Sequence, residues 1–488
     1  MKKNYSPWIH QLEKTREVKV LNENKSTDIV IIGAGIAGVI TSYFVLKNTD
    51  KKVILIDANL AGHGASGHNA GQLTTYFERP LADIATEFGV DVACSGQKDV
   101  ESAWDILEEL QKEIDFKTPI YDFTGYAGLS ELKQVLIHLA DNMIRYDGGL
   151  KVERMLIADN FKNLQDIPEI YSHLYEVTTQ ENILDLLETE NKSYIATLAY
   201  KKGATNSARI CEEVLDYVLE KYQNRFEIYE NSPVESITLN QEEVILEVKT
   251  KESTKDLNLV EEKIKIENIL ENNFKLKSNK IISKKIILCT NGFEGFDIIN
   301  NSGAEINNKF HSNISGRVNY MSAYLDQNVE EPIAISYFPK EKLIDADNNT
   351  LTGEQYFYMT RRPHIHNGEE MGLISTGGPE KILTEGEIYN RDDTCEDWAE
   401  KDINNFLKNN YKKHKGDHIE YDFCWHGLLG YTANGIRMIG FENNNINLLY
   451  NLGCNGIGIM PSIFGAKKIS EMLSGVAFEK SIFDPRIN

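Results

Sequence analysis

The sequence predicts an α/β fold in which a doubly wound, largely parallel sheet is joined to a second domain rich in β-structure. The first observation is a set of short, nearly apolar segments that end in glycine-rich turns, such as Ile29–Ile32 and Lys285–Thr290. Strands buried on both faces of a parallel sheet have this composition. The second is a β-rich stretch with turns between about residues 306 and 424. The third is the length of 488 residues, which exceeds one simple core and favours two domains.

The order of these patterns predicts discontinuous domains. Residues 1–27 are expected to form a polar arm, from which Trp8, Ile9 and Leu12 dock on the body. Residues 239–285 are rich in Glu, Lys and Asn, which predicts an extended surface hairpin or, alternatively, a charged and partly disordered insertion. The doubly wound domain is expected to contain residues 28–115, 196–305 (with that insertion) and 430–488, and the β-rich α+β domain residues 116–195 and 306–429.

The first strand is followed by three glycines at the spacing G-x-G-x-x-G and then by a helical pattern. Gly33 allows a tight turn, Gly35 lets a pyrophosphate approach the backbone, and Gly38 lets the helix pack close to the sheet. The helix start adds free N–H groups and the positive end of a dipole. A second strand, residues 52–57, ends in Asp57, where a carboxylate can accept from ribose hydroxyls. These features predict a dinucleotide site; the alternative is an ordinary glycine-rich βαβ turn.

The remaining elements follow from periodicity and from turn residues. Helical spacing predicts helices over residues 81–115, 130–145, 207–222, 398–407 and 461–473. Apolar or alternating segments predict strands over residues 122–129, 194–200, 226–229, 234–238, 285–290, 317–324, 356–359, 372–379 and 446–450. The helices alternate with strands at both ends of the chain, as a doubly wound sheet requires.

Composition and charge exclude several classes of function. The formal net charge of −22 argues against binding to nucleic acid or to an anionic membrane surface. No apolar run approaches the length of a transmembrane helix, and the first residues lack the apolar core of a secretory signal. The six cysteines are scattered without a C-x-x-C pair, so we expect no metal site and a cytoplasmic protein.

Three glycine-rich turns, near residues 33, 292 and 453, follow strand-like segments at the start, middle and end of the chain. Ligands of an open α/β sheet bind at the carboxyl ends of its strands. One long ligand touched by all three turns is therefore expected. FAD has the required length, whereas NAD sites draw mostly on one continuous domain.

Further motifs occur in a fixed order along the chain. A glycine-rich loop spans residues 61–72, Gly203–Asn206 opens a helix, Val234 begins a short strand, and Leu288–Gly292 ends another. Near the C-terminal end the sequence has Trp425, Gly427, Thr432, Asn434 and Gly440, followed by the loop Gly453–Gly458.

In this order the motifs resemble the FAD-dependent amine and amino-acid oxidoreductases of the D-amino-acid oxidase, glycine oxidase and sarcosine oxidase group. Within this group the chain looks most like the gamma-glutamylputrescine oxidoreductases. The resemblance covers most of the chain outside residues 239–285 and makes the doubly wound domain a Rossmann-like FAD-binding domain, with substrate bound by the other. It implies that FAD contacts Gly33, Gly35, Ile36, Ala37, Gly38, Asp57, Ala58, Gly64, Ala65, Ser66, Asn69, Ala70, Gly71, Gln72, Val234, Thr290, Asn291, Gly292, Gly453, Asn455, Gly456, Ile457 and Gly458.

Some positions depart from the family pattern. The last glycine motif often reads Gly-His-Gly, whereas this chain has Cys454-Asn455-Gly456, and Arg437 stands where proline is usual. Covalent attachment of the flavin in sarcosine-oxidase-like members needs a particular cysteine. Cys424 lies farther from Thr432 than that cysteine does from its threonine. We therefore expect FAD to be bound non-covalently.

The resemblance implies that a small amine or amino acid gives a hydride to flavin N5 and becomes an imine that water hydrolyses. Oxygen or another acceptor then reoxidises the flavin. Alternatives of other classes are FAD-dependent oxidation of a hydroxy acid or a glycerol-phosphate-type alcohol, an NAD-dependent dehydrogenase, and a flavin-binding protein without turnover.

Residues on the substrate side are expected in the β-rich domain. Tyr356 and Tyr358 are two apart and so share one side of a strand. Arg361 or Arg362 can clamp a carboxylate with two hydrogen bonds, and His426 lies in a motif near the flavin by resemblance. The alternatives are packing for the tyrosines and a solvated turn for the arginines. No protein acid or base is obligatory, so the catalytic residues stay unassigned.

Overall fold

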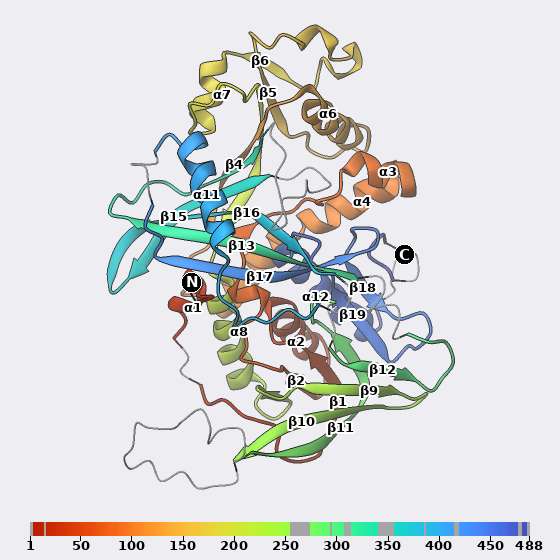
Figure 1. Cartoon of the computed structure of the whole chain (residues 1–488). Helices are drawn as coiled ribbons and strands as arrows, with labels where there is room; N and C mark the ends of the chain where they lie inside the picture. Colours follow the sequence, from red (N-terminus) through yellow and green to blue (C-terminus); the bar gives the residue numbers. More distant parts are fainter. Residues whose placement is uncertain are drawn as a thin grey trace.

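The structure is a computed structural model that describes residues 3–13, 16–253, 274–292, 295–306, 314–339, 356–384, 387–413, 419–476 and 481–485. Its described part contains two large mixed sheets, a nine-stranded one in the lower half of Figure 1 and a ten-stranded one in the upper half. The lower sheet contains β1 (Lys25–Ile32), β2 (Val53–Ile56), β8 (Phe226–Tyr229), β9 (Val234–Leu239), β10 (Val244–Ser253), β11 (Phe274–Leu288), β12 (Asp297–Asn300), β18 (Met438–Phe441) and β19 (Leu448–Leu452).

The upper sheet belongs mostly to the β-rich part of the chain. Its strands are β3 (Gln72–Leu73), β4 (Tyr121–Leu129), β5 (Arg154–Ala158), β6 (Glu176–Thr178), β7 (Ala196–Ala204), β13 (Ile314–Asp326), β14 (Ile333–Phe338), β15 (Phe357–His366), β16 (Glu369–Ile382) and β17 (Phe423–Thr432). The pairings among β13, β15, β16 and β17 are antiparallel, as expected for a β-rich substrate-side region.

Helices lie beside both sheets (Figure 1). They are α1 (Pro7–His10), α2 (Ile36–Asn48), α3 (Leu81–Phe88), α4 (Val90–Glu101), α5 (Ala103–Ile114), α6 (Leu132–Asp147), α7 (Gln180–Leu186), α8 (Ser207–Lys221), α11 (Asp397–Asn410) and α12 (Ile459–Leu473), with short 3-10 turns η1 (Ala65–Gly67), η2 (Leu164–Asp166) and η3 (Glu169–Tyr171). The helical pattern over 81–115 forms three helices rather than one, because the chain breaks at Gly89, where φ is +91°, and again at Ser102.

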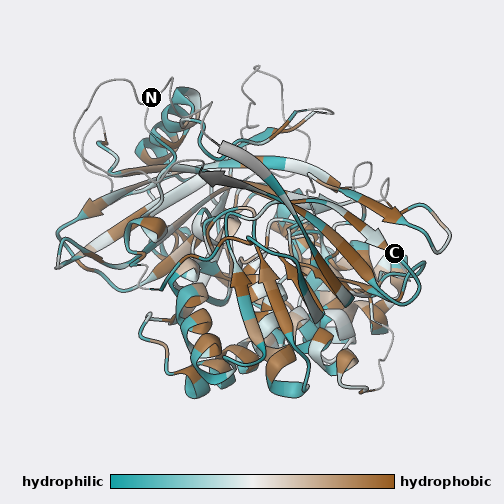
Figure 2. Ribbon diagram, turned by 90° about the horizontal axis from the view of Figure 1, so that it is seen from below, coloured by the Kyte–Doolittle hydropathy of each residue, from teal (hydrophilic) through white to brown (hydrophobic). Residues whose placement is uncertain are grey.

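The centre of the lower sheet is parallel, in the order β19-β11-β1-β2-β8. Residues Ile29–Ile32 of β1 pair with Lys285–Leu288 of β11 on one side and with Val53–Ile56 of β2 on the other. All four β1 residues are buried, as their β-branched composition predicts. The predicted α/β class with a doubly wound sheet is confirmed, and these apolar strands appear brown in Figure 2.

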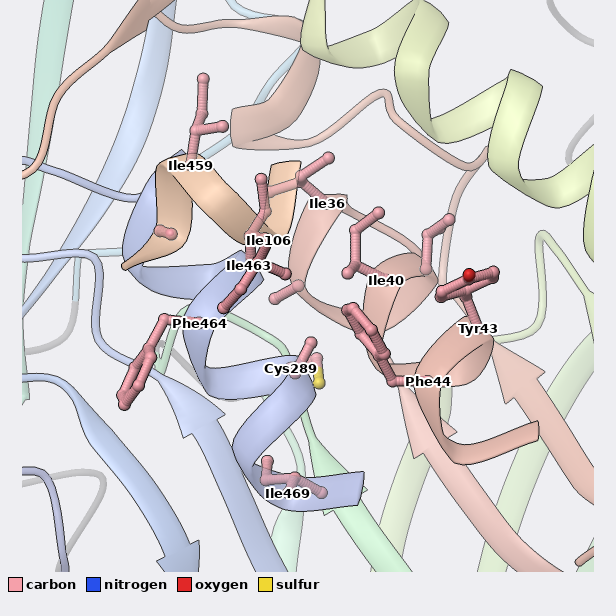
Figure 3. Packing of buried hydrophobic residues seen from close by; sticks show 14 of the residues in the cluster. Ile36, Ile40, Tyr43, Phe44, Ile106, Cys289, Ile459, Ile463, Phe464 and Ile469 are labelled. Atoms are coloured by element: carbon pink, nitrogen blue, oxygen red, sulfur yellow. The ribbon is translucent and has the colours of Figure 1, made fainter. Parts of the chain in front are cut away.

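Helices α2 and α12 pack against each other on this sheet (Figure 3). Ile36, Ile40 and Phe44 of α2 belong to the same buried cluster as Ile463 and Phe464 of α12. The two helices come from opposite ends of the chain, so their packing fixes the start of α2 relative to the start of α12. Both starts border the cavity described below.

The hairpin expected within residues 239–285 is present as β10 and β11, which pair antiparallel. It is more than a surface appendage, because the second half of β11 continues into the centre of the lower sheet between β1 and β19. Val244, Leu246 and Val248 of β10 are fully buried and belong to the core of that sheet. Residues 254–273 lie outside the described part of the chain.

The N-terminal arm docks through the residues that the sequence indicated. Trp8 is completely buried and packs with Trp425, and Ile9 and Leu12 contact the same cluster. Among the described residues, no helix is both long enough and apolar enough to span a bilayer.

Candidate active site

A single cavity of about 1530 Å³ is lined by residues from both sheets. Its lining includes the turn after β1, the end of β2, the loop before β3, the turn after β11, the end of β17 and the start of α12. Ordinary small-molecule pockets measure roughly 300–1,000 Å³. The cavity therefore has room for one long ligand together with a second, smaller one.

One part of the cavity is built by the G-x-G-x-x-G turn. Gly35 precedes α2 without a side-chain cap, and the backbone N–H of Ile36 donates to the Ser66 hydroxyl at 2.8 Å. The next two N–H groups lie in the first helical turn and so have no acceptor within the helix. A Cβ on Gly35 would lie 2.9 Å from that hydroxyl, which explains the absence of a side chain. Backbone N–H groups and a helix N-terminus together suit a phosphate.

Asp57 ends β2 and faces the same part of the cavity. One carboxylate oxygen accepts from the Ala34 N–H at 2.6 Å, and the other from the Asn59 N–H at 2.7 Å. Burial raises the pKa of Asp57, while these two N–H donors oppose that rise. Each carboxylate oxygen has a second lone pair, so the group can still accept hydrogen bonds from ribose hydroxyls.

The loop before β3 is held by the two buried tryptophans. The Asn69 carbonyl accepts from Trp8 Nε1 at 2.6 Å and from Trp425 Nε1 at 3.2 Å. His68 Nδ1 lies 3.1 Å from the Gly64 carbonyl, and burial lowers the pKa of His68 to about 4. His68 thus caps the loop backbone as a neutral ring.

Two asparagines with positive φ connect the later turns. Asn291 (φ 71°) accepts from the Cys454 N–H at 3.1 Å and donates to the Leu428 carbonyl at 3.1 Å. Asn455 (φ 46°) accepts from the Thr432 N–H at 2.7 Å through its side chain. Asparagine tolerates this backbone region better than other residues. The turns after β11 and β19 are therefore joined to β17 at the cavity wall.

The structure brings most of the predicted cofactor residues to the cavity. The lining contains Gly33, Gly35, Ile36, Ala37, Asp57, Ala58, Gly64, Ala65, Ser66, Asn69, Ala70, Gly71, Gln72, Val234, Thr290, Asn291, Asn455, Gly456, Ile457 and Gly458. Three predicted glycines pack behind the wall instead. A Cβ added to Gly38 would meet the carbonyl oxygen of Gly33. One added to Gly292 would meet the side chain of Ile314, and one added to Gly453 would meet the side chain of Thr432. These three shape the turns without lining the cavity.

Another part of the cavity is aromatic and polar. Tyr356 and Tyr358 both line it, as expected for two residues on one side of a strand. The Tyr356 hydroxyl donates to Glu78 Oε1 at 2.8 Å, and the Tyr358 hydroxyl donates to Asn319 Oδ1 at 2.6 Å. The Tyr358 ring lies over Gly377, where a Cβ would come within 2.5 Å of it.

The structure places the other three predicted substrate-side residues away from this cavity. Arg361 donates twice to Glu188, at 2.5 and 2.9 Å, and is buried in that ion pair. Arg362 is buried with its guanidinium 4.2 Å from the Trp8 ring centre. The His426 ring is buried between the Tyr389 hydroxyl and the Asp393 carbonyl. Each side chain is occupied elsewhere, and none lines the cavity.

Several cavity residues were not among the sequence candidates: Glu78, Arg317, Glu380, Tyr431 and Arg437. Glu78 lies shortly after the predicted glycine-rich loop, and this position in the sequence could have indicated that it lines the cavity. Arg317 and Glu380 meet through the β13–β16 pairing, which one sequence does not reveal. Arg437, at the position where the family pattern has proline, is buried and donates to the Asn451 side chain and backbone carbonyl, both at 2.8 Å.

The groups that line the cavity suit a dinucleotide cofactor. They combine a helix N-terminus, a carboxylate at the end of the second strand, and glycine-rich turns from three parts of the chain at one cavity. Among the described residues, no group of His, Cys, Asp and Glu is arranged to hold a metal ion.

Two curated relatives share parts of the sequence. The gamma-glutamylputrescine oxidoreductase of Escherichia coli (strain K12) is 34% identical over 73 residues, which cover 15% of this chain and 17% of that protein. "Probable oxidoreductase OrdL" of Haemophilus influenzae is 25% identical over 236 residues, which cover 48% of this chain and 47% of that protein. The matched segments thus span less than half of either relative.

Solved structures match over nearly the full chain. The glycine oxidase from Geobacillus kaustophilus superposes with a TM-score of 0.58 at 12% identity, covering 94% of this chain and 98% of that one. NikD, described as an unusual amino acid oxidase, gives 0.62 at 10% identity, with 95% and 98% covered. The L-alpha-glycerophosphate oxidase from Mycoplasma pneumoniae gives 0.55 at 12% identity, with 94% and 96% covered. At these identities the likeness concerns the fold.

The family assignment comes from a sequence model that spans most of the chain. The model of the family described as "FAD dependent oxidoreductase" (DAO) matches residues 28–472, which include the glycine motif and nearly all of both sheets and of α12. This match agrees with the groups that line the cavity and with the superposed folds. The chain therefore belongs to the DAO family of FAD-dependent oxidoreductases.

Proposed function

We propose that this protein oxidises the C–N bond of a small amine or amino acid with FAD. The observation that carries the proposal is the shared cavity, in which a dinucleotide cradle continues into a pocket lined by carboxylates and tyrosines. Glycine oxidase and the amino acid oxidase NikD, which share this fold, support it by analogy.

FAD would be held by the cavity-lining members of the predicted cofactor set, with its pyrophosphate at the start of α2 and a ribose at Asp57. The residue ranges assigned above to the FAD-binding and substrate domains remain part of the proposal.

We propose that FAD is bound non-covalently, because Cys424 does not line the cavity and its thiol lies 3.1 Å from Glu400 Oε2. Cys454 does line the cavity, but burial raises the pKa of its thiol and so weakens it as a nucleophile. Acid precipitation is expected to leave the yellow colour in the supernatant.

Bound FAD supplies a two-electron acceptor for the hydride on the carbon next to nitrogen. The amine loses that hydride and one N–H proton, and the resulting imine takes up water to give a carbonyl compound and ammonia or an amine. Dioxygen or another acceptor takes the two electrons in the second half of the cycle. The protein's role is to orient the substrate C–H bond and to exclude bulk water. The tyrosines that line the cavity favour the exclusion of water.

Oxidation of a hydroxy acid or a glycerol-phosphate-type alcohol is the second candidate, because the glycerophosphate oxidase has the same fold. A phosphate group requires a basic cluster, and the arginine pair at 361–362 lies away from the cavity. Of the arginines that do line the cavity, Arg79 is paired with Glu87 and Arg317 with Glu380. A flavin-binding protein without turnover is the third candidate.

An anaerobic screen distinguishes these functions. Purified protein is mixed with D- and L-amino acids, N-methyl amino acids, polyamines, hydroxy acids and glycerol phosphates while the oxidised flavin band is recorded. Bleaching by amines or amino acids is expected. Bleaching by hydroxy acids or glycerol phosphates alone would support the second candidate, and no bleaching by any compound would support the third. Failure to take up FAD would overturn the cofactor assignment.

A cytoplasmic location is also proposed, since the six cysteines, all among the described residues, form no disulfide bond with one another. Fractionation of cells that express the protein with its native termini tests the location.

A further inference from the structure

Glu78 lies between the loop Gly453–Gly458, which is predicted to contact FAD, and the aromatic part of the cavity. A Cβ on Gly456, in the loop that precedes α12, would lie 2.7 Å from Glu78 Cγ and 3.0 Å from the Tyr431 hydroxyl. On its other side the Glu78 carboxylate accepts from the Tyr356 hydroxyl. The Glu78 carboxylate therefore lies next to the loop Gly453–Gly458, inside the cavity.

The other charged pair in this pocket is internally neutral. Arg317 Nη1 lies 3.3 Å from Glu380 Oε2, and the guanidinium stacks 4.4 Å from the Tyr431 ring centre. Within the described residues no arginine, lysine or histidine forms an ion pair with Glu78. Of the other arginines that line the cavity, Arg79 pairs with Glu87 and Arg437 donates to Asn451. The buried Lys202, which does not line the cavity, acts on Glu78 electrostatically without forming an ion pair with it. The aromatic part of the cavity therefore holds two carboxylates, Glu78 and Glu380, and one lining cation that is paired with the second of them.

Tyrosine rings surround this carboxylate. Tyr356 and Tyr358 have ring centres 5.9 Å apart, and Tyr76 and Tyr431 also line the cavity. The faces of aromatic rings attract cations, and they attract them more strongly where water is excluded. A carboxylate among aromatic faces is complementary to an ammonium group and unfavourable for a carboxylate.

We propose that this pocket recognises the substrate as an ammonium cation held by Glu78, so that the preferred substrate is an aliphatic amine whose reacting end carries no carboxylate. This inference rests on the proposed oxidation of a C–N bond and narrows its substrate class. Because hydride loss needs the nitrogen lone pair, the bound ammonium first gives one proton to Glu78 or to water, and the neutral amine then reacts as described above.

Arg317 is the rival determinant, since a free guanidinium would select an amino acid by its carboxylate. Glu380 engages Arg317 Nη1 at 3.3 Å, whereas the buried Arg317 Nε has no hydrogen-bond partner among the described residues. The carboxylate probes in the test below therefore decide between Glu78 and Arg317.

The pH dependence follows from the groups that face Glu78. Burial raises the pKa of Glu78 to about 7, and the Tyr356 hydrogen bond opposes this rise. The charged groups and phenols nearby are Glu380, Lys202, Arg317, Tyr76, Tyr200, Tyr356, Tyr358 and Tyr431. Only ionised Glu78 attracts the cation. Affinity for an ammonium ion should therefore rise about tenfold per pH unit up to about pH 7 and then level off.

The test uses probes of one shape that lack a hydrogen on the carbon next to the functional group and so resist oxidation. They are tert-butylammonium, tert-butanol, pivalate and the zwitterion 2-aminoisobutyrate. Titration calorimetry on the FAD-loaded protein is expected to show tert-butylammonium binding at least about tenfold more tightly than pivalate and 2-aminoisobutyrate. Glu78→Gln should weaken tert-butylammonium at least about tenfold, remove its pH dependence and leave tert-butanol unchanged.

Glu108→Gln is the matched control, because it removes the same charge from an exposed position on α5 and should change no affinity. Tighter binding of pivalate or 2-aminoisobutyrate, or unchanged ammonium affinity in Glu78→Gln, would refute the inference. The anaerobic screen separates this failure from failure of the proposed function. Bleaching by amino acids but not by simple amines refutes only the inference, whereas no bleaching by either class refutes both.

Discussion

At the scale of single residues, the glycine motif makes a prediction with an internal control. A Cβ on Gly38 would lie 1.8 Å from the Gly33 carbonyl oxygen, a backbone atom that cannot move without opening the turn. Gly38→Ala should therefore lower the free energy of unfolding by about 3 kcal/mol or more and abolish FAD uptake. Gly64→Ala, where a Cβ meets nothing within 4 Å, should leave the melting temperature of the apoprotein unchanged. Equal stability of both variants would contradict the packing described for α2.

A buried lysine makes stability depend on pH. Lys202 is completely buried, donates to Gln72 Oε1 at 3.1 Å and to Ser336 Oγ at 3.2 Å, and has its pKa lowered to about 7 by burial. Between pH 7 and about 10.5 the unfolded chain binds more protons at this site than the folded protein, so stability rises with pH.

Lys202→Met removes this titration. The free energy of unfolding of the wild type minus that of Lys202→Met should therefore rise by up to about 1.4 kcal/mol per unit from pH 7 to 9. Urea titrations at each pH measure the difference. Lys201→Met, at the neighbouring exposed position, should show no such slope. A falling difference would mean that the buried ammonium is stabilised when charged.

At the scale of elements, Arg361 connects β15 to the segment that follows α7. Its ion pair with Glu188 is mostly shielded from solvent, with side-chain exposures of 6% and 11%, and Tyr411 beyond α11 accepts a further hydrogen bond. Lys413 also donates to Glu188, at 2.7 Å, so Glu188 keeps one cationic partner when Arg361 is removed. Arg361→Met should therefore cost about 1.5–3 kcal/mol of stability through its lost charged hydrogen bonds. Affinities for the four probes should not change. A loss of pivalate binding at unchanged stability would instead place Arg361 at the substrate.

At the scale of the whole molecule, the parts predictable from sequence are those fixed by local constraints. The turn at Gly33–Gly38 needs glycine for steric reasons, and the strand at Ile29–Ile32 is apolar because both of its faces are covered. The Glu380–Arg317 pair was not predictable, because it depends on the β13–β16 register. Arg361 was misleading for the same reason. An arginine suits a carboxylate from substrate or protein equally well, and only the folded chain shows that Glu188 is its partner.

The N-terminal arm joins the two regions that enclose the cavity. Asn4 donates to the His426 carbonyl of β17 at 3.2 Å, while Trp8 donates to Asn69 in the loop before β3. Asn206, at the start of α8, donates to the Trp8 carbonyl at 3.1 Å. One short segment thus contacts β17, the loop before β3 and α8, although its own sequence shows no cofactor motif.

Loss of this arm should therefore weaken FAD binding without removing any cavity-lining residue. Trp8→Ala should cost about 3–5 kcal/mol of stability through lost packing and should also lower FAD affinity, because the Asn69 loop loses one of its two tryptophan donors. Trp8→Phe retains most of the ring but not the N–H, so it separates the hydrogen bond from the packing. Flavin fluorescence titrations of the apoproteins, with melting curves, measure both quantities. If Trp8→Ala bound FAD as tightly as the wild type despite its lower stability, the arm would act only as a structural clasp, and the shape of the Asn69 loop would be set by Trp425 alone.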